Sequence, residues 1–151
     1  MKMRASTFFS EEQKQQIVSA IEEAEKNTSG EIRLHVEMRC FGDIMKRAAK
    51  VFDRLKMQCT ELRNGVLFYM AVADRQFAII GDKGINEKVP EGFWDDIEKH
   101  MAELFAKGLF TEGVTDGIRM AGEQLKKHFP YLADDVNELS NEISFGESGK
   151  E

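Results

Sequence analysis

The segment Val66–Val72 constrains the fold most, because it is hydrophobic at every position. A strand that is hydrophobic on both faces is typical of the centre of a sheet that is covered on both sides. The segment therefore predicts a layer of helices on each face of a sheet. The hydrophobic stretch ends at Ala73, far short of the ~20 residues that a membrane-spanning helix needs. We expect no membrane-spanning segment and no membrane partner.

Two further strands are predicted beside this segment. In residues 32–38 apolar residues alternate with Arg33, His35 and Glu37, and this period of two predicts a strand with only one well-buried face. Such a strand is expected near the edge of a sheet. Phe77–Ile80 follows the central segment after a short connection, so the two segments are expected to form a β-hairpin.

Helices are predicted before, between and after the strands. Ser10 and Gln13 fit a capping box, in which each side chain bonds a free backbone N–H group at the start of a helix. Apolar residues at helical spacing predict further helices over about 43–57, 92–107 and 111–128. We therefore expect an α/β fold in the order α-β-α-β-β-α-α, a three-layer α/β/α sandwich around a small mixed sheet that contains the hairpin.

The charge pattern separates the end of the chain from the rest. The formal net charge is −6, and acidic residues are concentrated after Pro130. We predict one domain over residues 1–130 and an acidic, partly docked C-terminal tail over 131–151. Val136, Leu139 and Ile143 have helical spacing, so part of the tail is expected to dock as a helix. No basic residues cluster as nucleic-acid binding requires, and no nucleic-acid partner is expected.

The number of cysteines and the first residues of the chain predict the cellular compartment of the protein. The chain has two cysteines, which are too few for a disulfide scaffold. Residues 1–6 pass into a polar helical pattern without the apolar core of a signal peptide. We expect a soluble, cytoplasmic domain with reduced thiols.

The predicted order determines which loops lie together. A strand–helix–strand connection forms a right-handed parallel crossover, and the hairpin then reverses the chain. The starts of the first two strands and the end of the third therefore share one edge of the sheet. We call this edge the amino margin, and it carries Gly30, Glu31, Arg63, Asn64 and Asp82–Asn86. The opposite edge, the carboxyl margin, carries Arg39, Cys40 and the Asp74–Arg75 turn.

The loop Gly81-Asp82-Lys83-Gly84 is the main candidate at the amino margin. Glycines allow backbone conformations that bring N–H groups close to an anion. Together with Asp82, the later residues Asn86 and Glu91 offer oxygen ligands to a hard cation such as calcium or magnesium. The alternative is that these glycines serve only the geometry of a turn.

The remaining polar candidates each have an ordinary explanation beside a functional one. Asp74 and Arg75 at the hairpin tip are either a functional ion pair or solvated turn residues. Arg63 is a candidate for anion binding, while Asn64 before a glycine is good turn chemistry. Cys40 lacks the spacing of a phosphatase loop and is expected to be an ordinary buried cysteine. No catalytic residue is identified from these patterns.

Several segments together resemble the TPM-domain family, in its short bacterial branch. They are Asn27–Ile32, Arg63–Leu67, Asp74–Arg75, Ala78–Ile85, Phe93–Trp94 and Asp134–Leu139. The resemblance implies an α/β/α fold that is sometimes described as Rossmann-like. It also implies acid phosphatase activity in some members, and calcium or another divalent ion in a loop-lined pocket in others. Many members carry Gly-x-Gly-Leu-Glu where this chain has Gly84-Ile85-Asn86, which lowers the charge of the ligand set.

We therefore expect a TPM-like domain that is a divalent-ion-binding accessory or protein-interaction module. The alternative is a metal-assisted acid phosphatase acting on phosphomonoesters, in which Arg75 or Lys83 neutralises phosphoryl oxygens. A divalent cation and a protein partner are expected, and an organic cofactor is not. The candidate ligands of the cation are Asp82, Asn86 and Glu91. The candidate pocket residues are Glu31, Arg63, Asn64, Asp74, Arg75, Gly81, Lys83 and Gly84.

Overall fold

The centre of the sheet is β2 (Gly65–Ala71), and every residue of this strand is buried, as its hydrophobic sequence predicts. The structure is a computed structural model and describes residues 4–131 and 137–146. β2 pairs in parallel with β1 (Glu31–Glu37) and antiparallel with β3 (Gln76–Gly81). The predicted parallel crossover and the predicted hairpin are both confirmed.

β1 lies near an edge of the sheet, as predicted, but the prediction that only one of its faces is well buried was wrong. The strand order is β3-β2-β1-β4, because β4 (Ser144–Gly146) pairs in parallel with β1. His35 and Glu37, which were expected on an open face, are buried, and Glu37 bonds to Arg47 of the helix that covers this face. The short β4 has no period that marks it as a strand, and Ser144 lies 109 residues from His35, its neighbour in the sheet.

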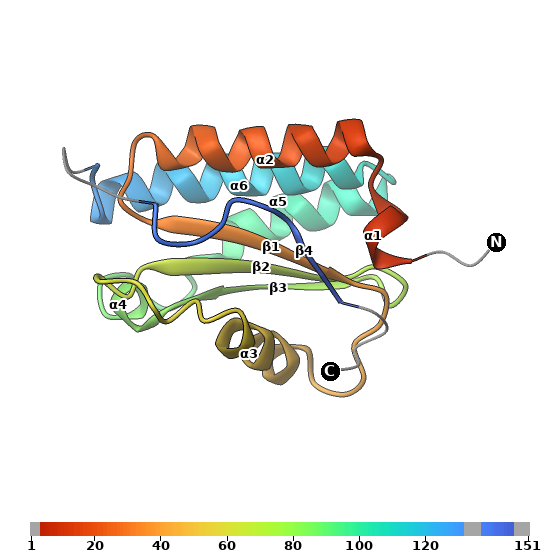
Figure 1. Cartoon of the computed structure of the whole chain (residues 1–151), viewed down its shortest axis with the longest axis horizontal. Helices are drawn as coiled ribbons and strands as arrows, with labels where there is room; N and C mark the ends of the chain where they lie inside the picture. Colours follow the sequence, from red (N-terminus) through yellow and green to blue (C-terminus); the bar gives the residue numbers. More distant parts are fainter. Residues whose placement is uncertain (1–3, 132–136, 147–151) are drawn as a thin grey trace.

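Helices cover both faces of the sheet, which confirms the three-layer α/β fold (Figure 1). The helices on one face are α2 (Glu11–Glu25), α5 (Asp95–Ala106) and α6 (Phe110–His128). The other face is covered by α3 (Ile44–Arg54). Two short helices, α1 (Ala5–Phe8) and α4 (Lys83–Asn86), and the strand β4 are additions to the predicted order. Within the described residues no helix has the length and apolar character to cross a membrane.

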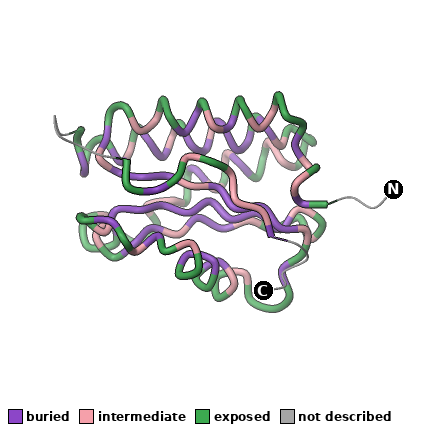
Figure 2. Tube along the Cα trace, in the orientation of Figure 1, coloured by how far each residue is buried: buried purple, intermediate pink, exposed green. Residues whose placement is uncertain are grey.

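The alternation of side chains divides the core between the two faces. Ile32, Leu34 and Val36 of β1 pack in the larger cluster, together with residues of α2, α5 and α6. Leu67 and Tyr69 of β2 pack in the smaller cluster, together with residues of α3. Figure 2 shows the buried strands as a continuous layer between helices whose outer sides are exposed.

Local signals determine where the helices begin and end. Ser10 Oγ accepts a hydrogen bond from Gln13 N at 3.1 Å, and Ser10 N donates to Gln13 Oε1 at 2.9 Å, so the predicted capping box is confirmed. Asp43 caps α3 by accepting bonds from the next backbone N–H groups. α3 ends at Arg54, earlier than predicted, and Lys56 then has a left-handed backbone with φ of 57°.

The described part of the C-terminal tail holds a strand and no helix, so the predicted docked helix is not found in residues 137–146. Leu139 is buried, and its N–H donates to Glu31 Oε1 at 2.5 Å. β4 then pairs with β1. Val136, the first residue of the predicted helix, lies outside the described residues. Strand pairing prevails here because the free edge of β1 presents backbone groups that need partners.

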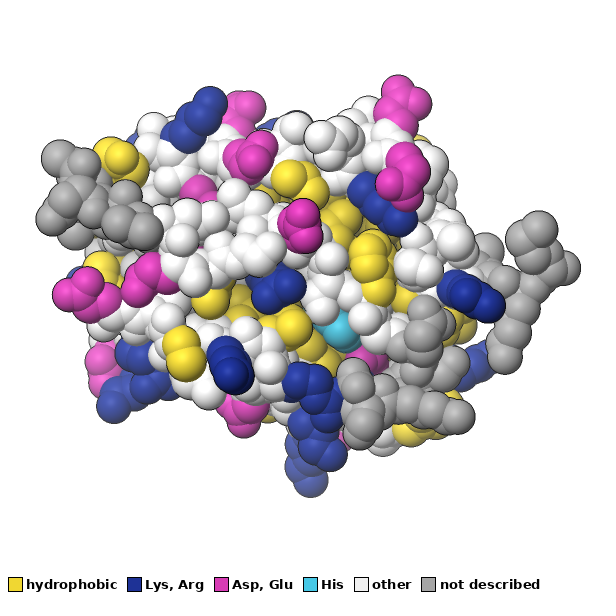
Figure 3. Space-filling view, viewed as in Figure 1, with side chains coloured by type: hydrophobic (Ala, Val, Ile, Leu, Met, Phe, Trp, Pro, Cys, Tyr) yellow, Lys and Arg dark blue, Asp and Glu magenta, His cyan; other side chains and the backbone are white. Residues whose placement is uncertain are grey.

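Figure 3 shows the face that carries β4. Acidic and basic side chains are interspersed over its described part, with hydrophobic side chains exposed between them. This visible surface therefore lacks the one-sign charge that would attract a strongly charged partner over a long range.

Candidate functional site

Separate chain segments meet at the amino margin. Glu31 N donates to Asn64 O at 3.2 Å, and Asp82 N donates to Gly65 O at 2.9 Å. The Asn64 side chain is buried, and its Nδ2 donates to Ser29 O at 3.1 Å. The predicted meeting of Glu31, Asn64 and Asp82 is thus confirmed. That these residues bind a ligand stays a prediction.

The Gly81–Gly84 loop is a helical turn that leaves no cradle of free N–H groups. Asp82 caps α4 and accepts a hydrogen bond from Lys83 N at 2.8 Å. Gly84 N donates to Arg63 O at 2.8 Å, and a side chain at Gly84 would collide with the carbonyl oxygens of Leu62 and Arg63. The glycine at position 84 therefore permits a close approach of two backbone segments. The Lys83 side chain is exposed.

The Arg63 guanidinium group pairs with the Asp82 carboxylate, which was expected to bind a cation. Its Nε and Nη2 lie 2.7 and 2.9 Å from the two carboxylate oxygens of Asp82. Asn86 Nδ2 donates to Gly81 O at 3.2 Å, and Glu91 is exposed. In the described part of the chain, no three His, Cys, Asp or Glu side chains form a group that could hold a metal ion. The residues at this margin do not fit the cation that the family resemblance implies, because Arg63 already neutralises Asp82.

The carboxyl groups of the half-buried Glu25 and the buried Glu31 lie beside the start of β1. Glu25 Oε2 accepts a hydrogen bond from Ile32 N at 2.8 Å, and burial raises the pKa of Glu25 to about 8. Burial also raises the pKa of Glu31 to about 7. Both residues line a pocket of about 240 Å³ whose wall includes residues of the C-terminal tail. Both groups therefore bind a proton at higher pH than ordinary carboxyl groups do.

At the carboxyl margin, the Asp74 side chain bonds to residues other than its neighbour Arg75. Arg39 Nη1 donates to Asp74 Oδ1 at 3.1 Å, and Cys40 N donates to Asp74 Oδ2 at 2.6 Å. Asp74 therefore ties the end of β1 to the hairpin tip. Arg75 has a left-handed backbone with φ of 54°, and it is exposed.

A buried polar network connects β1, β2, α3 and β4. The fully buried Glu37 carboxylate accepts hydrogen bonds from Tyr69 Oη at 2.7 Å and from Arg47 Nε and Nη2 at 3.0 and 2.5 Å. His35 Nε2 lies 3.0 Å from Glu37 Oε2, and His35 Nδ1 lies 2.9 Å from Ser144 Oγ. The network holds α3 and the C-terminal strand against the central sheet.

Burial and hydrogen bonding shift the pKa values of Glu37 and Tyr69 in this network. Burial alone would raise the pKa of Glu37, but hydrogen bonds from His35, Arg47 and Tyr69 lower it to about 2. Burial and the Glu37 carboxylate raise the pKa of Tyr69. Burial also raises the pKa of Cys40. The thiolate is the reactive form of cysteine. The raised pKa therefore favours the protonated, less reactive thiol at Cys40.

The sequence pattern did not reveal this network, because the alternation in residues 32–38 placed His35 and Glu37 on an open face of the strand. The available signal was Tyr69, since a buried tyrosine hydroxyl needs a hydrogen-bond partner. The parallel register aligns Tyr69 with His35, and Glu37 follows two residues later on the same side of β1. α3 and β4 together bury this pair, and the pairing of β4 with β1 has no sequence signal.

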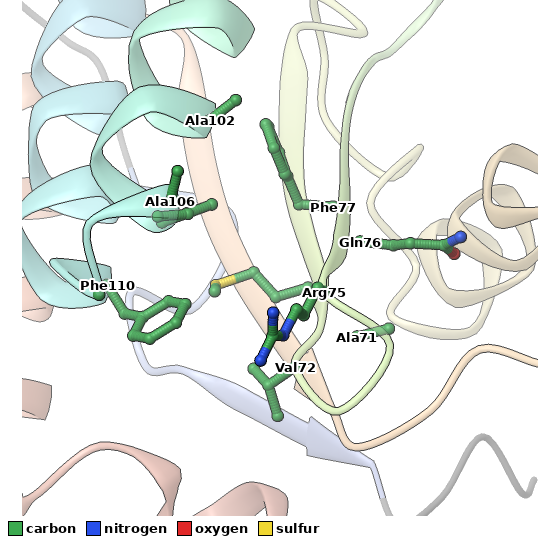
Figure 4. A pocket seen from close by; sticks show the side chains of 11 residues that line it. Ala71, Val72, Arg75, Gln76, Phe77, Ala102, Ala106 and Phe110 are labelled. Carbon is green, nitrogen blue, oxygen red and sulfur yellow. The ribbon is translucent and has the colours of Figure 1, made fainter.

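A largely apolar pocket of about 540 Å³ also opens at the carboxyl margin. It lies between the end of the hairpin and the turn from α5 to α6 (Figure 4). Phe77, Phe105 and Phe110 form its aromatic wall, with ring centroids 5.1 Å apart for Phe77 and Phe105 and 5.7 Å apart for Phe105 and Phe110. The other lining residues are Met70, Ala71, Val72, Arg75, Gln76, Ala102, Ala106 and Gly108.

Arg75 is the charged residue of this pocket wall. Figure 4 shows its guanidinium group between Phe110 and Val72, while Gln76 points away from them. The arrangement combines an apolar interior with a cation at one side. Of the candidate site residues predicted from the sequence, Arg75 alone lines this pocket. Phe77 and Phe105 were assigned only to a predicted strand and a predicted helix, and Phe110 was assigned to neither of the two predicted helices beside it.

Comparisons with known proteins agree with this architecture. The family model described as TPM domain matches residues 3–124. The chain is similar to the NMR structure of the BA42 protein from the psychrophilic bacterium Bizionia argentinensis, with 50% identity and a TM-score of 0.88. That match covers 92% of this chain and 96% of the BA42 chain. No curated protein matches the chain.

More distant structures share the fold alone. An N-terminal domain of a protein from P. gingivalis is 17% identical, with a TM-score of 0.65 over 82% of this chain and 79% of that one. An N-terminal domain of a protein from Corynebacterium glutamicum is 13% identical, with a TM-score of 0.62 over 78% of this chain and 74% of that one.

Proposed function

The chain belongs to the TPM-domain family, and from this premise we propose that it is a protein-interaction module that docks partners at the apolar pocket of the carboxyl margin. The pocket itself is the observation that carries the proposal. Its volume of about 540 Å³ and its phenylalanine wall match typical binding pockets, which are mostly apolar with a few polar groups. The occupant is an apolar side chain of a partner polypeptide.

The position of the pocket in the fold supports the same function. In α/β sheets, ligands bind outside the carboxyl ends of the parallel strands. The pocket includes Met70 and Ala71 at that end of β2, and it continues into the exposed α5–α6 turn. Aromatic residues are also enriched at the centres of protein interfaces. An aromatic pocket among exposed turns suits the insertion of a side chain from another protein.

The other expected functions have less support from the described residues. A role in binding divalent ions would need Asp82, whose oxygens are bonded to Arg63. A phosphatase would need a nucleophile or a base beside a cation, whereas burial raises the pKa of the Cys40 thiol.

A peptide titration tests the docking function. The probe is the peptide acetyl-Gly-Ser-Gly-Leu-Phe-amide, and the measurement is the NMR chemical shift of the full chain. Burial of one large apolar side chain contributes about 1.5–3 kcal/mol, so weak binding is expected, with shifts confined to Phe77, Phe105, Phe110 and their neighbours.

Two variants decide whether the pocket is the site. Ala102 is exposed and lines the pocket, so Ala102→Trp fills it without disturbing the core and is expected to abolish the shifts. Ala49→Trp makes the same change on an exposed position of α3 and should leave the binding unchanged. Shifts located elsewhere, or equal binding by Ala102→Trp, would refute the docking site.

A further inference from the structure

We propose that the pocket of the carboxyl margin recognises the free carboxyl terminus of a partner polypeptide. The last side chain of the partner lies among Phe77, Phe105 and Phe110, and its terminal carboxylate pairs with the Arg75 guanidinium. This inference rests on the proposed docking function and adds the chemical identity of the group that docks.

The charge of the pocket points to an anionic ligand. Arg75 is the charged residue among those that line it. The adjacent carboxylate, Asp74, already accepts hydrogen bonds from Arg39 and from Cys40 N. In the described ranges 4–131 and 137–146, no salt bridge is formed by Arg75. Its donors are available to a ligand in the pocket.

The backbone at Arg75 adds an independent indication. Its φ of 54° lies in the left-handed region, where a residue with a Cβ costs about 1–2 kcal/mol. Strained residues of this kind cluster at ligand-binding sites, and of the three non-glycine residues with positive φ among those that the structure describes, Lys56, Arg63 and Arg75, Arg75 is the one that lines this pocket. Glycine or asparagine would relieve the strain but would remove the guanidinium from the wall of the pocket.

A carboxyl terminus fits both parts of the pocket. The planar guanidinium forms paired hydrogen bonds with a carboxylate. In the last residue of a polypeptide, the terminal carboxylate and the side chain are attached to the same Cα. A site that binds both groups must therefore place a cation next to an apolar wall, as Arg75 and Phe110 are placed in Figure 4. Leu109, which is 38% exposed, extends the apolar surface beyond the pocket. This outer surface is available to preceding residues of a peptide and would be unused by a small carboxylic acid.

The experiment compares three probes by NMR titration of the full chain. They are acetyl-Gly-Ser-Gly-Leu-Phe with a free carboxylate, the same peptide with a terminal amide, and decanoate. We expect the free acid to bind about tenfold more tightly than the amide, as for one charge-assisted hydrogen-bonded pair. The preference should weaken with added salt, because the pair is partly exposed.

Variants assign the preference to one side chain. Arg75→Gln should reduce the ratio of acid to amide affinity to about one. Arg119→Gln removes an exposed arginine of α6 that does not line the pocket, so it should leave the ratio unchanged. Circular dichroism of both variants checks that they are folded.

Each contrary result has a distinct meaning. Equal binding of acid and amide at the pocket would refute recognition of the carboxylate while leaving the docking function intact. Failure of both peptides to bind would refute the docking function as well. Arg75-dependent binding of decanoate without binding of the acid peptide would overturn the proposal in favour of a small amphiphilic acid.

Discussion

Glu37 shows how a single buried side chain organises its surroundings. Its carboxylate accepts hydrogen bonds from Arg47, Tyr69 and His35, which belong to α3, β2 and β1. Burial of a charge is costly unless the charge is paired and hydrogen-bonded. The set of partners meets this requirement, and it lowers the pKa of Glu37 to about 2.

Glu37→Ala is predicted to lower the free energy of unfolding by about 3 kcal/mol or more, as loss of one member of a buried ion pair does. Tyr69 and Arg47 both lose their bonds to this carboxylate. Urea denaturation measures the change. Glu103→Ala on the exposed side of α5 is the control and should change the stability by less than about 0.5 kcal/mol. Similar effects of the two substitutions would contradict the structural role of the network.

At the level of elements, the C-terminal segment completes the sheet. β4 covers the edge of β1, and Leu139 donates its N–H to the buried Glu31. Gly146 lies against the network, because a Cβ there would be 2.8 Å from Glu37 Oε2 and 3.0 Å from His35 Nε2. The segment thus closes the core around the residues that β1 directs towards α3.

Removal of residues 131–151 is predicted to lower Tm by roughly 5–10 °C, on the scale of about 2–4 °C per kcal/mol for a domain of this size. The deletion exposes the edge of β1 and removes the buried Leu139 together with the Ser144 bond to His35. Differential scanning calorimetry measures the shift. A chain that ends at Gly146 keeps β4 and should melt close to the full chain. Equal melting of all three chains would mean that β4 does not stabilise the fold.

At the level of the whole molecule, carboxyl groups with shifted pKa values act on stability in opposite directions. The pKa of Glu37 is lowered to about 2, whereas those of Glu25 and Glu31 are raised to about 8 and about 7. A raised folded-state pKa means that the folded chain holds more protons than the unfolded chain over the interval between the two values. Glu25 and Glu31 therefore favour folding at acidic pH, and Glu37 favours it above the ordinary carboxyl range.

The free energy of unfolding is predicted to fall as the pH rises from about 4.5 to about 8, through the contribution of Glu25 and Glu31. Urea denaturation at pH 5, 6.5 and 8 measures this slope. Glu25→Gln keeps an oxygen that can accept the Ile32 N–H bond but does not ionise, so it should flatten the slope. An unchanged slope in this variant would show that Glu25 has an ordinary pKa in the folded chain.

The sequence predicted much of the fold and little of the candidate site. Val66–Val72 identified the central strand because a strand buried on both faces has no polar positions. The meeting of Glu31, Asn64 and Asp82 followed from the handedness of the crossover and the reversal at the hairpin. The pocket was missed because Phe77 and Phe105 have the spacing of core residues and Phe110 lies between two predicted helices, and spacing does not reveal where packing leaves a gap.

The sequence by itself determined the local and topological features: the central strand, the capping box of α2, the crossover and the hairpin. These depend on backbone geometry and on the burial of regularly spaced side chains, which act over short stretches of the chain. Only the tertiary structure decided that β4 returns to β1, that Asp82 pairs with Arg63 and that Asp74 pairs with Arg39. Such contacts depend on which distant side chains finally come within hydrogen-bond distance, and that is fixed by the packing of the whole molecule.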